Sequence, residues 1–360
     1  MLGQLCSAFW DSQSQPDVIQ PGFEPGTVVS PLAQRCSALD RYAAWLLSGV
    51  GDALGYRNQL WEYNDSEPAI HQELQELGGL KNITAQLSDW PVSDDTVLHL
   101  ATAEALATGK EGEELLQDVA ARYVEGMKDM EGRKPGPSSI LAHSQCRNGF
   151  GTKCPYSPDG TGCGAAMRSM CIGLYPCPEQ LSTLVAIAVE TGRMTHPHPT
   201  VFLGAVVSAL FTSYAVQCRP ITTWGLGLVK EACPIAKRRQ RDWGYFTEKW
   251  EWTGPVLWPA SCGPAERDEV YKSFSLKGWA GRSGHGAPMI ALDELMSREG
   301  FHGGDSDSTA VIACCCWGLL HGTEGVLPGN YTHLEYRERL ESSAEKLYAL
   351  SHTGADKYDP

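Results

Sequence analysis

The stretch PHPTVFLGAVVSALFTSYAV, residues 197–216, decides the fold. Pro197 and Pro199 indicate a helix start, because proline is tolerated in the first helical turn, where its missing N–H has no partner in any case. The run Val201–Val216 is almost wholly apolar, but it is shorter than the roughly 20 residues that a bilayer requires, and it contains Ser208. We therefore predict a central buried helix rather than a membrane span.

Helical periods continue on both sides of this segment. Apolar residues recur at helical spacing over residues 113–130, 180–192 and 331–350, and a further helix is expected from Ser37 onward. Convincing strand hairpins are scarce and no repeat of solenoid length is visible, so we predict an all-α fold. The glycines after Trp45, at positions 49, 51 and 55, suit a tight bend near a ligand or a neighbouring backbone.

Composition excludes several classes of function. The chain has 360 residues, of which 42% are hydrophobic and 20% charged, the balance of a soluble globular protein. Its formal net charge of −14 repels phosphate backbones and anionic lipid. The short basic run Lys237–Arg241 is interpreted as a solvated surface. We expect neither a nucleic-acid nor a membrane partner.

Cysteine usage indicates a reducing compartment. The thirteen cysteines form neither a repeating framework nor paired zinc-ligand spacing, and three of them are consecutive at Cys314–Cys316. The first residues show no positive segment followed by an apolar one, so no secretory signal is expected. We expect reduced thiols and a cytoplasmic protein.

Two helix starts are unusually acidic. In Val92–Thr96, Ser93 is expected to cap a helix whose first turn contains Asp94 and Asp95. Stabilisation of the helix dipole by acidic residues would be enough to explain this motif taken alone.

The second acidic start is harder to explain by capping. His302–Thr309 combines two glycines with alternating carboxylates and hydroxyls before an apolar helix at Ala310–Leu320. Glycine permits close backbone approach, and Asp305, Asp307 and Ser308 offer hard oxygen ligands within one turn, as Mg²⁺ prefers. The same residues match the D-x-D-x-T form of aspartyl-phosphate enzymes, but no hydrophobic strand precedes them, as that chemistry requires.

Several long motifs in the same order resemble one family, the ADP-ribosyl-acceptor hydrolases, and most closely its ADP-ribosylarginine hydrolase branch. The resemblance extends from about Tyr42 to Leu350. It is carried by Gly51–Tyr56, Val92–Thr96, Gly162–Arg168, Gly192–His196 and His302–Thr309.

The resemblance implies an all-α, single-domain orthogonal helical bundle of the ADP-ribosylglycohydrolase type. We place this domain at residues 39–352, after a flexible N-terminal extension at 1–38 and before a short tail at 353–360. We expect a monomer.

The resemblance also implies the chemistry. The expected reaction is Mg²⁺-dependent hydrolysis of the N-glycosidic bond between ADP-ribose and arginine side chains of mono-ADP-ribosylated proteins. The partners would be these arginines and ADP-ribose. Asp94 and Asp95 are the candidate catalytic residues, either of which would position or deprotonate the attacking water. The implied ligands of two Mg²⁺ ions are Ser93, Asp94, Asp95, Asp305, Asp307 and Ser308.

The substrate would lie against several loops. Residues 160–164, opening an expected helix at Ala165, would present backbone N–H groups to the pyrophosphate, and residues 277–285 resemble the family's ribose and adenine loop. Glu62 is expected on the acceptor side. The full set of candidate substrate residues is Glu62, Gly136, Ser138, Gly162, Cys163, Gly164, His196, Gly278, Trp279, Ser283 and Gly284.

Three departures from the family pattern keep alternatives open. Gly286 stands where an acidic residue is expected, Cys314 stands where glycine is usual, and the chain is shorter between Met296 and Phe301 and again between Tyr245 and Glu266. A displacement of Asp305 and Asp307 by about 1 Å would cost on the order of a hundredfold in rate. The alternatives are a non-catalytic ADP-ribose-binding protein and a hydrolase of serine-linked or polymeric ADP-ribose.

Overall fold

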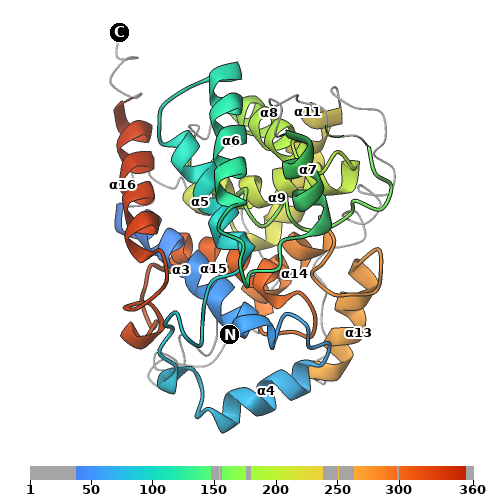
Figure 1. The fold of residues 1–360 in the computed structure, drawn as a ribbon, viewed down its shortest axis with the longest axis vertical. Coiled ribbons are helices and arrows are strands. Elements are labelled where there is room, and N and C mark those ends of the chain that lie inside the picture. Colours follow the sequence, from blue (N-terminus) through green and yellow to red (C-terminus); the bar gives the residue numbers. More distant parts are fainter. Residues whose placement is uncertain are drawn as a thin grey trace, which may run out of the picture.

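Helices are the regular secondary structure of the described part of the chain. A computed structural model describes residues 38–146, 154, 156–175, 180–237, 250, 263–297 and 300–353. These ranges contain no strand, only an isolated bridge between Gly162 and Ser283. The helices cross at varied angles, with α4 lying crosswise below the upright α6 and α16 in Figure 1. The predicted all-α fold is confirmed.

The α-helices, with their bounds, are α3 (Ala38–Tyr56), α4 (Glu67–Glu76), α5 (Asp94–Leu106), α6 (Gly112–Gly126), α7 (Pro137–Cys146), α8 (Leu181–Arg193), α9 (Pro199–Val216), α10 (Trp224–Gly227), α11 (Cys233–Lys237), α13 (Pro264–Phe274), α14 (Gly286–Ser297), α15 (Ser306–His321) and α16 (Arg337–Thr353). Short helical turns are η1 (Arg57–Gln59), η2 (Leu80–Asn82), η3 (Met170–Leu174), η4 (Ile221–Thr223), η5 (Leu228–Ala232) and η6 (Pro328–Asn330).

Helix α9 forms the centre of the core. Every residue from Thr200 to Ala215 is buried, and the helix contacts α8, η3, α14 and α15. Among the described helices it alone is long and apolar enough to cross a membrane, yet 94% of its residues, Pro199–Val216, are buried inside the protein. The predicted central buried helix is confirmed, and its apolar surface is covered by protein.

Helices α3 and α15 pack together through small residues, more extensively than any other described pair. A Cβ on Gly51 would lie 2.4 Å from the Ala310 carbonyl oxygen, and one on Gly318 would lie 2.6 Å from the Ala44 Cα. The tight bend predicted at these glycines is wrong, because α3 continues without interruption to Tyr56. Gly51 and Gly55 instead allow the backbone of α15 to lie directly against α3.

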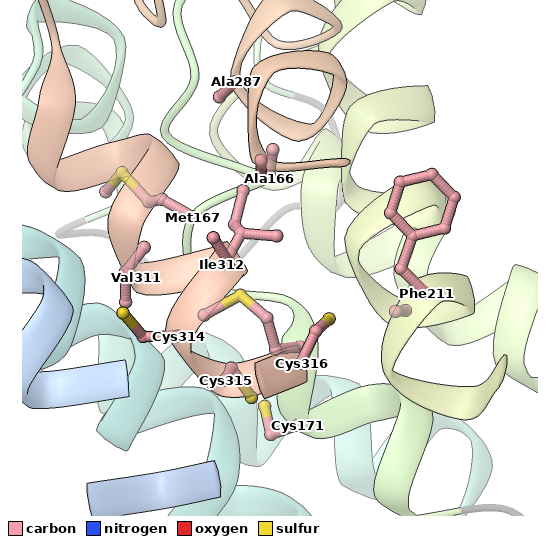
Figure 2. Close-up of a cluster of buried hydrophobic side chains, with 14 of the residues drawn as sticks. Ala166, Met167, Cys171, Phe211, Ala287, Val311, Ile312, Cys314, Cys315 and Cys316 are labelled. Carbon is pink, nitrogen blue, oxygen red and sulfur yellow. The ribbon is translucent and has the colours of Figure 1, made fainter. Parts of the chain in front are cut away.

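The cysteine triplet lies within this core. Cys314, Cys315 and Cys316 are buried cysteines on α15, and Figure 2 shows them projecting from different sides of the helix, with Cys315 toward Cys171. A Cβ on Gly51 would lie 2.9 Å from the Cys314 sulfur. The cysteine that replaces the usual glycine thus packs against a glycine of α3, which leaves room for it.

Two predicted helices differ from the structure. No helix begins at Ala165: residues 164–168 form turns, and the Ser169 hydroxyl donates to the Ala165 carbonyl at 2.6 Å. The Ser169 N–H donates to the carbonyl of Ala166, three residues back, rather than to that of Ala165, so the segment forms turns instead of an α-helix. The helix predicted over 331–350 begins only at Arg337 and ends at Thr353.

The predicted termini lie almost wholly outside the described residues. Of the extension at 1–38, only Ala38 is described, as the first residue of α3, and of the tail at 353–360 only Thr353, as the last residue of α16. Of the basic run at 237–241, only Lys237 is described, at the end of α11.

Candidate active site

The acidic starts of α5 and α15 open onto the same cavity. Its volume is about 480 Å³, and its lining includes Asp94 and Asp95 from α5 and Asp305, Asp307 and Ser308 from the start of α15. This volume is typical of small-molecule sites, which span roughly 300–1,000 Å³. Two motifs that are far apart in the sequence therefore form one site.

The buried carboxylate of Asp52, on α3, fixes the start of α5. Its oxygens accept hydrogen bonds from the backbone N–H groups of Ser93 and Thr96, each at 3.0 Å, and from the Thr96 hydroxyl. The Ser93 hydroxyl accepts from the Asp95 N–H at 3.1 Å, which confirms the predicted cap. Asp52 belongs to the Gly51–Tyr56 motif, but sequence reasoning did not assign it this role.

A second buried carboxylate, Asp268 on α13, fixes the loop before α15. It accepts from the Gly303 N–H at 2.8 Å and from the N–H of Glu67, the first residue of α4, at 2.7 Å. Asp268 was not predicted. No signal in the sequence singles it out, because its partners are backbone groups of two distant segments.

The same loop has two further attachments. The Gly304 N–H donates to the Asn64 carbonyl at 2.7 Å, which ties it to the segment that carries Glu62. The Ser306 hydroxyl donates to the Gly55 carbonyl at 3.0 Å, and a Cβ on Gly55 would lie 2.7 Å from the Asp307 backbone. Helix α3 thus supports both acidic starts, α5 through Asp52 and α15 through Gly55.

Glu62 lies closer to the aspartates than the sequence suggested. The carboxylates of Glu62, Asp305 and Asp307 each place an oxygen within 4.8 Å of the others. One buried oxygen of Glu62 and one of Asp95 have no hydrogen-bond partner within the described part of the chain. Glu62 had been expected on the acceptor side; the structure adds it to the candidate metal ligands.

Burial and mutual repulsion disfavour the charged form of these carboxylates unless a cation binds to them. Burial, followed by the charges of Asp305 and Asp94, raises the pKa of Glu62 to about 9. Burial, followed by the charges of Asp52 and Asp305, raises the pKa of Asp94 to about 8. Burial also raises the pKa values of Asp95 and Asp307 well above the ordinary range.

Cys163 brings a thiol into the same cluster. Its sulfur lies 3.3 Å from Asp305 Oδ2 and 3.2 Å from Ser308 Oγ. Burial, together with the charges of Asp305 and Asp95, holds the pKa of this thiol well above its usual value. Cys163 had been predicted to contribute to the substrate loop, and the contact of its side chain with a carboxylate was not foreseen.

Three further segments complete the lining of the cavity, at residues 134–139, 159–164 and 275–283, and together form its loop wall. The second and third are joined by the Gly162–Ser283 bridge and by a hydrogen bond from the Gly284 N–H to the Thr161 carbonyl at 3.0 Å. This wall also carries Lys134, Lys277 and Arg282. These cations were not predicted as site residues, and they suit an anionic ligand.

His196 is held on this wall by a buried hydrogen-bonded chain. Arg168 donates to the Thr195 hydroxyl at 2.8 Å, and that hydroxyl lies 2.7 Å from His196 Nδ1. Gly164 permits the approach of the ring, because a Cβ there would lie 2.8 Å from His196 Cε1. Burial, aided by the Arg168 charge, lowers the pKa of His196 to about 3, so the imidazole is neutral.

Most predicted site residues line the cavity and three do not. Among the substrate candidates, the lining includes Glu62, Gly136, Ser138, Gly162, Cys163, Gly164, His196, Trp279 and Ser283. Ser93, Gly278 and Gly284 are absent from the lining. The Ser93 hydroxyl is engaged by backbone, Gly278 is exposed, and Gly284 packs against Val201 of α9.

Comparisons with known proteins agree with this geometry. A family model described as ADP-ribosylglycohydrolase matches residues 37–356. The chain belongs to the ADP-ribosylglycohydrolase family. It is therefore a hydrolase of ADP-ribose linkages.

A relative and a solved structure support this placement. The chain is 36% identical to "ADP-ribosylhydrolase ARH1" of Dictyostelium discoideum, over 84% of this chain and 92% of the relative. It is also similar in fold to a solved "ADP-ribosylglycohydrolase-related protein complex", with a TM-score of 0.55 and 21% identity, over 87% of this chain and 98% of that chain. The predicted ADP-ribosylglycohydrolase-type bundle is confirmed.

Asp305 and Asp307 line the cavity although a shorter segment was expected before Phe301, where residues 298 and 299 lie outside the described part of the chain. Phe301 is buried and packs edge-on against Trp61, with ring centroids 4.9 Å apart. Trp61 directly precedes Glu62 in the sequence. The loop that follows therefore starts from a fixed point, and Asp305 and Asp307 still line the cavity with Asp94 and Asp95.

The donor set fits a hard divalent cation. Carboxylate oxygens predominate, and two of the buried ones, Glu62 Oε2 and Asp95 Oδ2, lack hydrogen-bond partners in the described residues. Buried carboxylates are paired with cations or protonated, because an unpaired buried charge is costly. Oxygen ligands of this kind are those that Mg²⁺ binds.

Proposed function

We propose that this chain hydrolyses the N-glycosidic bond between ADP-ribose and arginine side chains of modified proteins, with two Mg²⁺ ions at the acidic cluster. The observation that carries the proposal is the convergence of Asp94 and Asp95 with Asp305 and Asp307 on one cavity. The arginine linkage rests on the resemblance of the sequence motifs. We further propose that the protein acts as a cytoplasmic monomer.

The reaction builds positive, oxocarbenium-like charge on the ribose as the bond to nitrogen breaks. Divalent ions bound here would orient a water, lower its pKa and hold the ribose hydroxyls. Asp94 or Asp95 would accept the proton of that water. Asp305 and Asp307 would hold the ions, and Asp268 and α3 fix the segment that carries these two aspartates.

The loop wall would bind the rest of the substrate. Gly162–Gly164, Lys277 and Arg282 line the cavity there, and their backbone N–H groups and cationic side chains would suit the negative diphosphate. His196, which is neutral, offers a hydrogen bond without adding charge next to the developing cation. Trp279 is half-buried on the wall and provides an apolar face for a base or sugar.

The test compares acceptor linkages directly. Protein carrying arginine-linked ADP-ribose and a peptide carrying serine-linked ADP-ribose are each incubated with the chain and Mg²⁺, and released ADP-ribose is measured. We expect release from arginine only, its loss with a chelator, and its loss in Asp95→Asn. Faster release from serine would overturn the arginine assignment. ADP-ribose binding by calorimetry without turnover on either substrate would identify a non-catalytic binder.

A further inference from the structure

Tyr63 lies at the mouth of the active-site cavity. It belongs to the lining of the cavity, yet it is 52% exposed. Single exposed aromatic residues are common on protein surfaces and need no explanation. Tyr63 differs from these because it directly follows Glu62. The carboxylate of Glu62 places an oxygen within 4.8 Å of oxygens of Asp305 and Asp307, so this aromatic ring stands where the acidic cluster meets solvent.

The backbone around Tyr63 is fixed on both sides. Trp61 is fully buried, and its indole N–H donates to Glu73 Oε2 at 2.7 Å. The Asn64 N–H donates to the Trp61 carbonyl at 3.0 Å, and the Asn64 carbonyl accepts from the Gly304 N–H at 2.7 Å. Tyr63 thus projects from a turn that is held at both ends, which lowers the entropic cost of ordering the ring when a ligand binds.

The surroundings of the ring favour a cation. Burial, followed by the charge of Glu62, raises the pKa of Tyr63, and the charges of two aspartates of the acidic cluster act in the same direction. The phenol is therefore neutral, and its ring keeps the electron-rich face that attracts cations. A guanidinium suits such a face because it is planar and its charge is delocalised.

An arginine acceptor brings a guanidinium to this place. In an arginine-linked substrate the guanidinium is bonded to the anomeric carbon at which the bond breaks, so it lies next to the acidic cluster. We propose that Tyr63 binds the guanidinium of the acceptor on the face of its ring, and that this contact favours arginine-linked over serine-linked substrates. The inference rests on the proposed function, which puts the bond to arginine beside the acidic cluster. A serine acceptor has no charge and no planar group, and would gain little from the ring.

The first experiment measures acceptor binding without turnover. Butylguanidine, which carries the guanidinium of arginine, is titrated into the full chain saturated with Mg²⁺ and ADP-ribose, and its affinity is measured by ligand-observed NMR. We expect Tyr63→Leu to weaken its binding about three- to tenfold and Tyr63→Phe, which keeps the ring, to restore it. The affinity for ADP-ribose, which has no guanidinium, should be the same in Tyr63→Leu as in the unmodified chain. Leu60→Ala, at an exposed position outside the lining of the cavity, is the control and should leave both affinities unchanged.

Two results of this experiment would overturn the proposal. One is equal butylguanidine affinity in Tyr63→Leu and in the unmodified chain, or no binding to either. The other concerns butylurea, which has nearly the same shape but no charge and should bind weakly to every variant. If butylurea binding depended on Tyr63 as strongly as butylguanidine binding does, the ring would recognise an apolar chain and not a cation.

A second experiment uses the reaction. Tyr63→Leu should raise KM for the arginine-linked substrate about three- to tenfold with little change in kcat, because a contact made equally in the ground state and the transition state changes binding alone. A fall in kcat with KM unchanged would contradict this role. If the unmodified chain released no ADP-ribose from arginine but bound butylguanidine through Tyr63, the proposed function would fail and the binding role would stand. Normal release from arginine with butylguanidine binding independent of Tyr63 would remove the binding role alone.

Discussion

Asp268 offers the sharpest test of how the second acidic helix start is positioned. Its two oxygens accept from the N–H groups of Gly303 and Glu67, at 2.8 and 2.7 Å. Asp268→Asn keeps the shape but turns an amide NH₂ toward one of these donors. Loss of one hydrogen bond to a charged group costs about 1.5–3 kcal/mol. A shift of the Asp305 loop by about 1 Å would lower the rate on the order of a hundredfold.

The assay separates positioning from stability. Urea unfolding gives the free energy of unfolding, calorimetry gives the Mg²⁺ affinity, and steady-state kinetics give kcat and KM on an ADP-ribosylated substrate. We expect Asp268→Asn to have a lower kcat and a lower Mg²⁺ affinity when both are measured well below its unfolding temperature. Asp268→Glu should restore part of each. Glu269→Gln, on the same helix with a side chain 76% exposed, is the matched control. Unchanged kcat and Mg²⁺ affinity in a destabilised Asp268→Asn would refute the positioning role.

Three further changes test the site. Asp307→Asn removes a buried charge that neighbouring carboxylates oppose, so calorimetry should show loss of Mg²⁺ binding, while the Tm of the metal-free protein rises by about 1–2 °C per kcal/mol relieved; a lower Tm would contradict this. Because folding raises the pKa of Glu62 to about 9 and of Asp94 to about 8, the metal-free protein should lose stability as pH rises from about 4 toward 9. The Tm gain from Mg²⁺ should therefore be larger at high pH, and a gain independent of pH would count against the assignment. Gly55→Ala places a Cβ 2.7 Å from the Asp307 backbone. It should lower the free energy of unfolding, measured in urea, by about 1–3 kcal/mol, and it should also lower the activity. Gly126→Ala, whose Cβ would have its nearest neighbour at 3.5 Å, should be neutral or slightly stabilising.

Local patterns in the sequence were sufficient for the helical fold and for the two acidic motifs. The apolar run of α9, the amphipathic period of α6 and the Ser93 cap are properties of residues close together in the chain. Such properties depend on backbone geometry and side-chain polarity, which can be predicted from a short stretch of sequence. The expected helix at Ala165 is wrong: residues 164–168 form turns, in which the Ser169 N–H donates to the Ala166 carbonyl three residues back.

The support of the site was decided by tertiary structure. Asp52 and Asp268 accept hydrogen bonds from backbone N–H groups, and every residue except proline carries such a group, so no side-chain pattern reveals these partners. The position of Glu62 beside Asp305 and Asp307 depends on a loop held by the Gly304 N–H.

The sequence by itself indicated the aspartates of the two acidic helix starts as candidate cation ligands, but it did not indicate Glu62 as one. Only the packing of α3 against both helix starts, which is possible because glycine leaves room for a neighbouring backbone, determined that these residues would meet. The physical reason is range: helix formation and capping are set by neighbours in the chain, whereas a shared cavity requires complementary surfaces between segments that are distant in sequence.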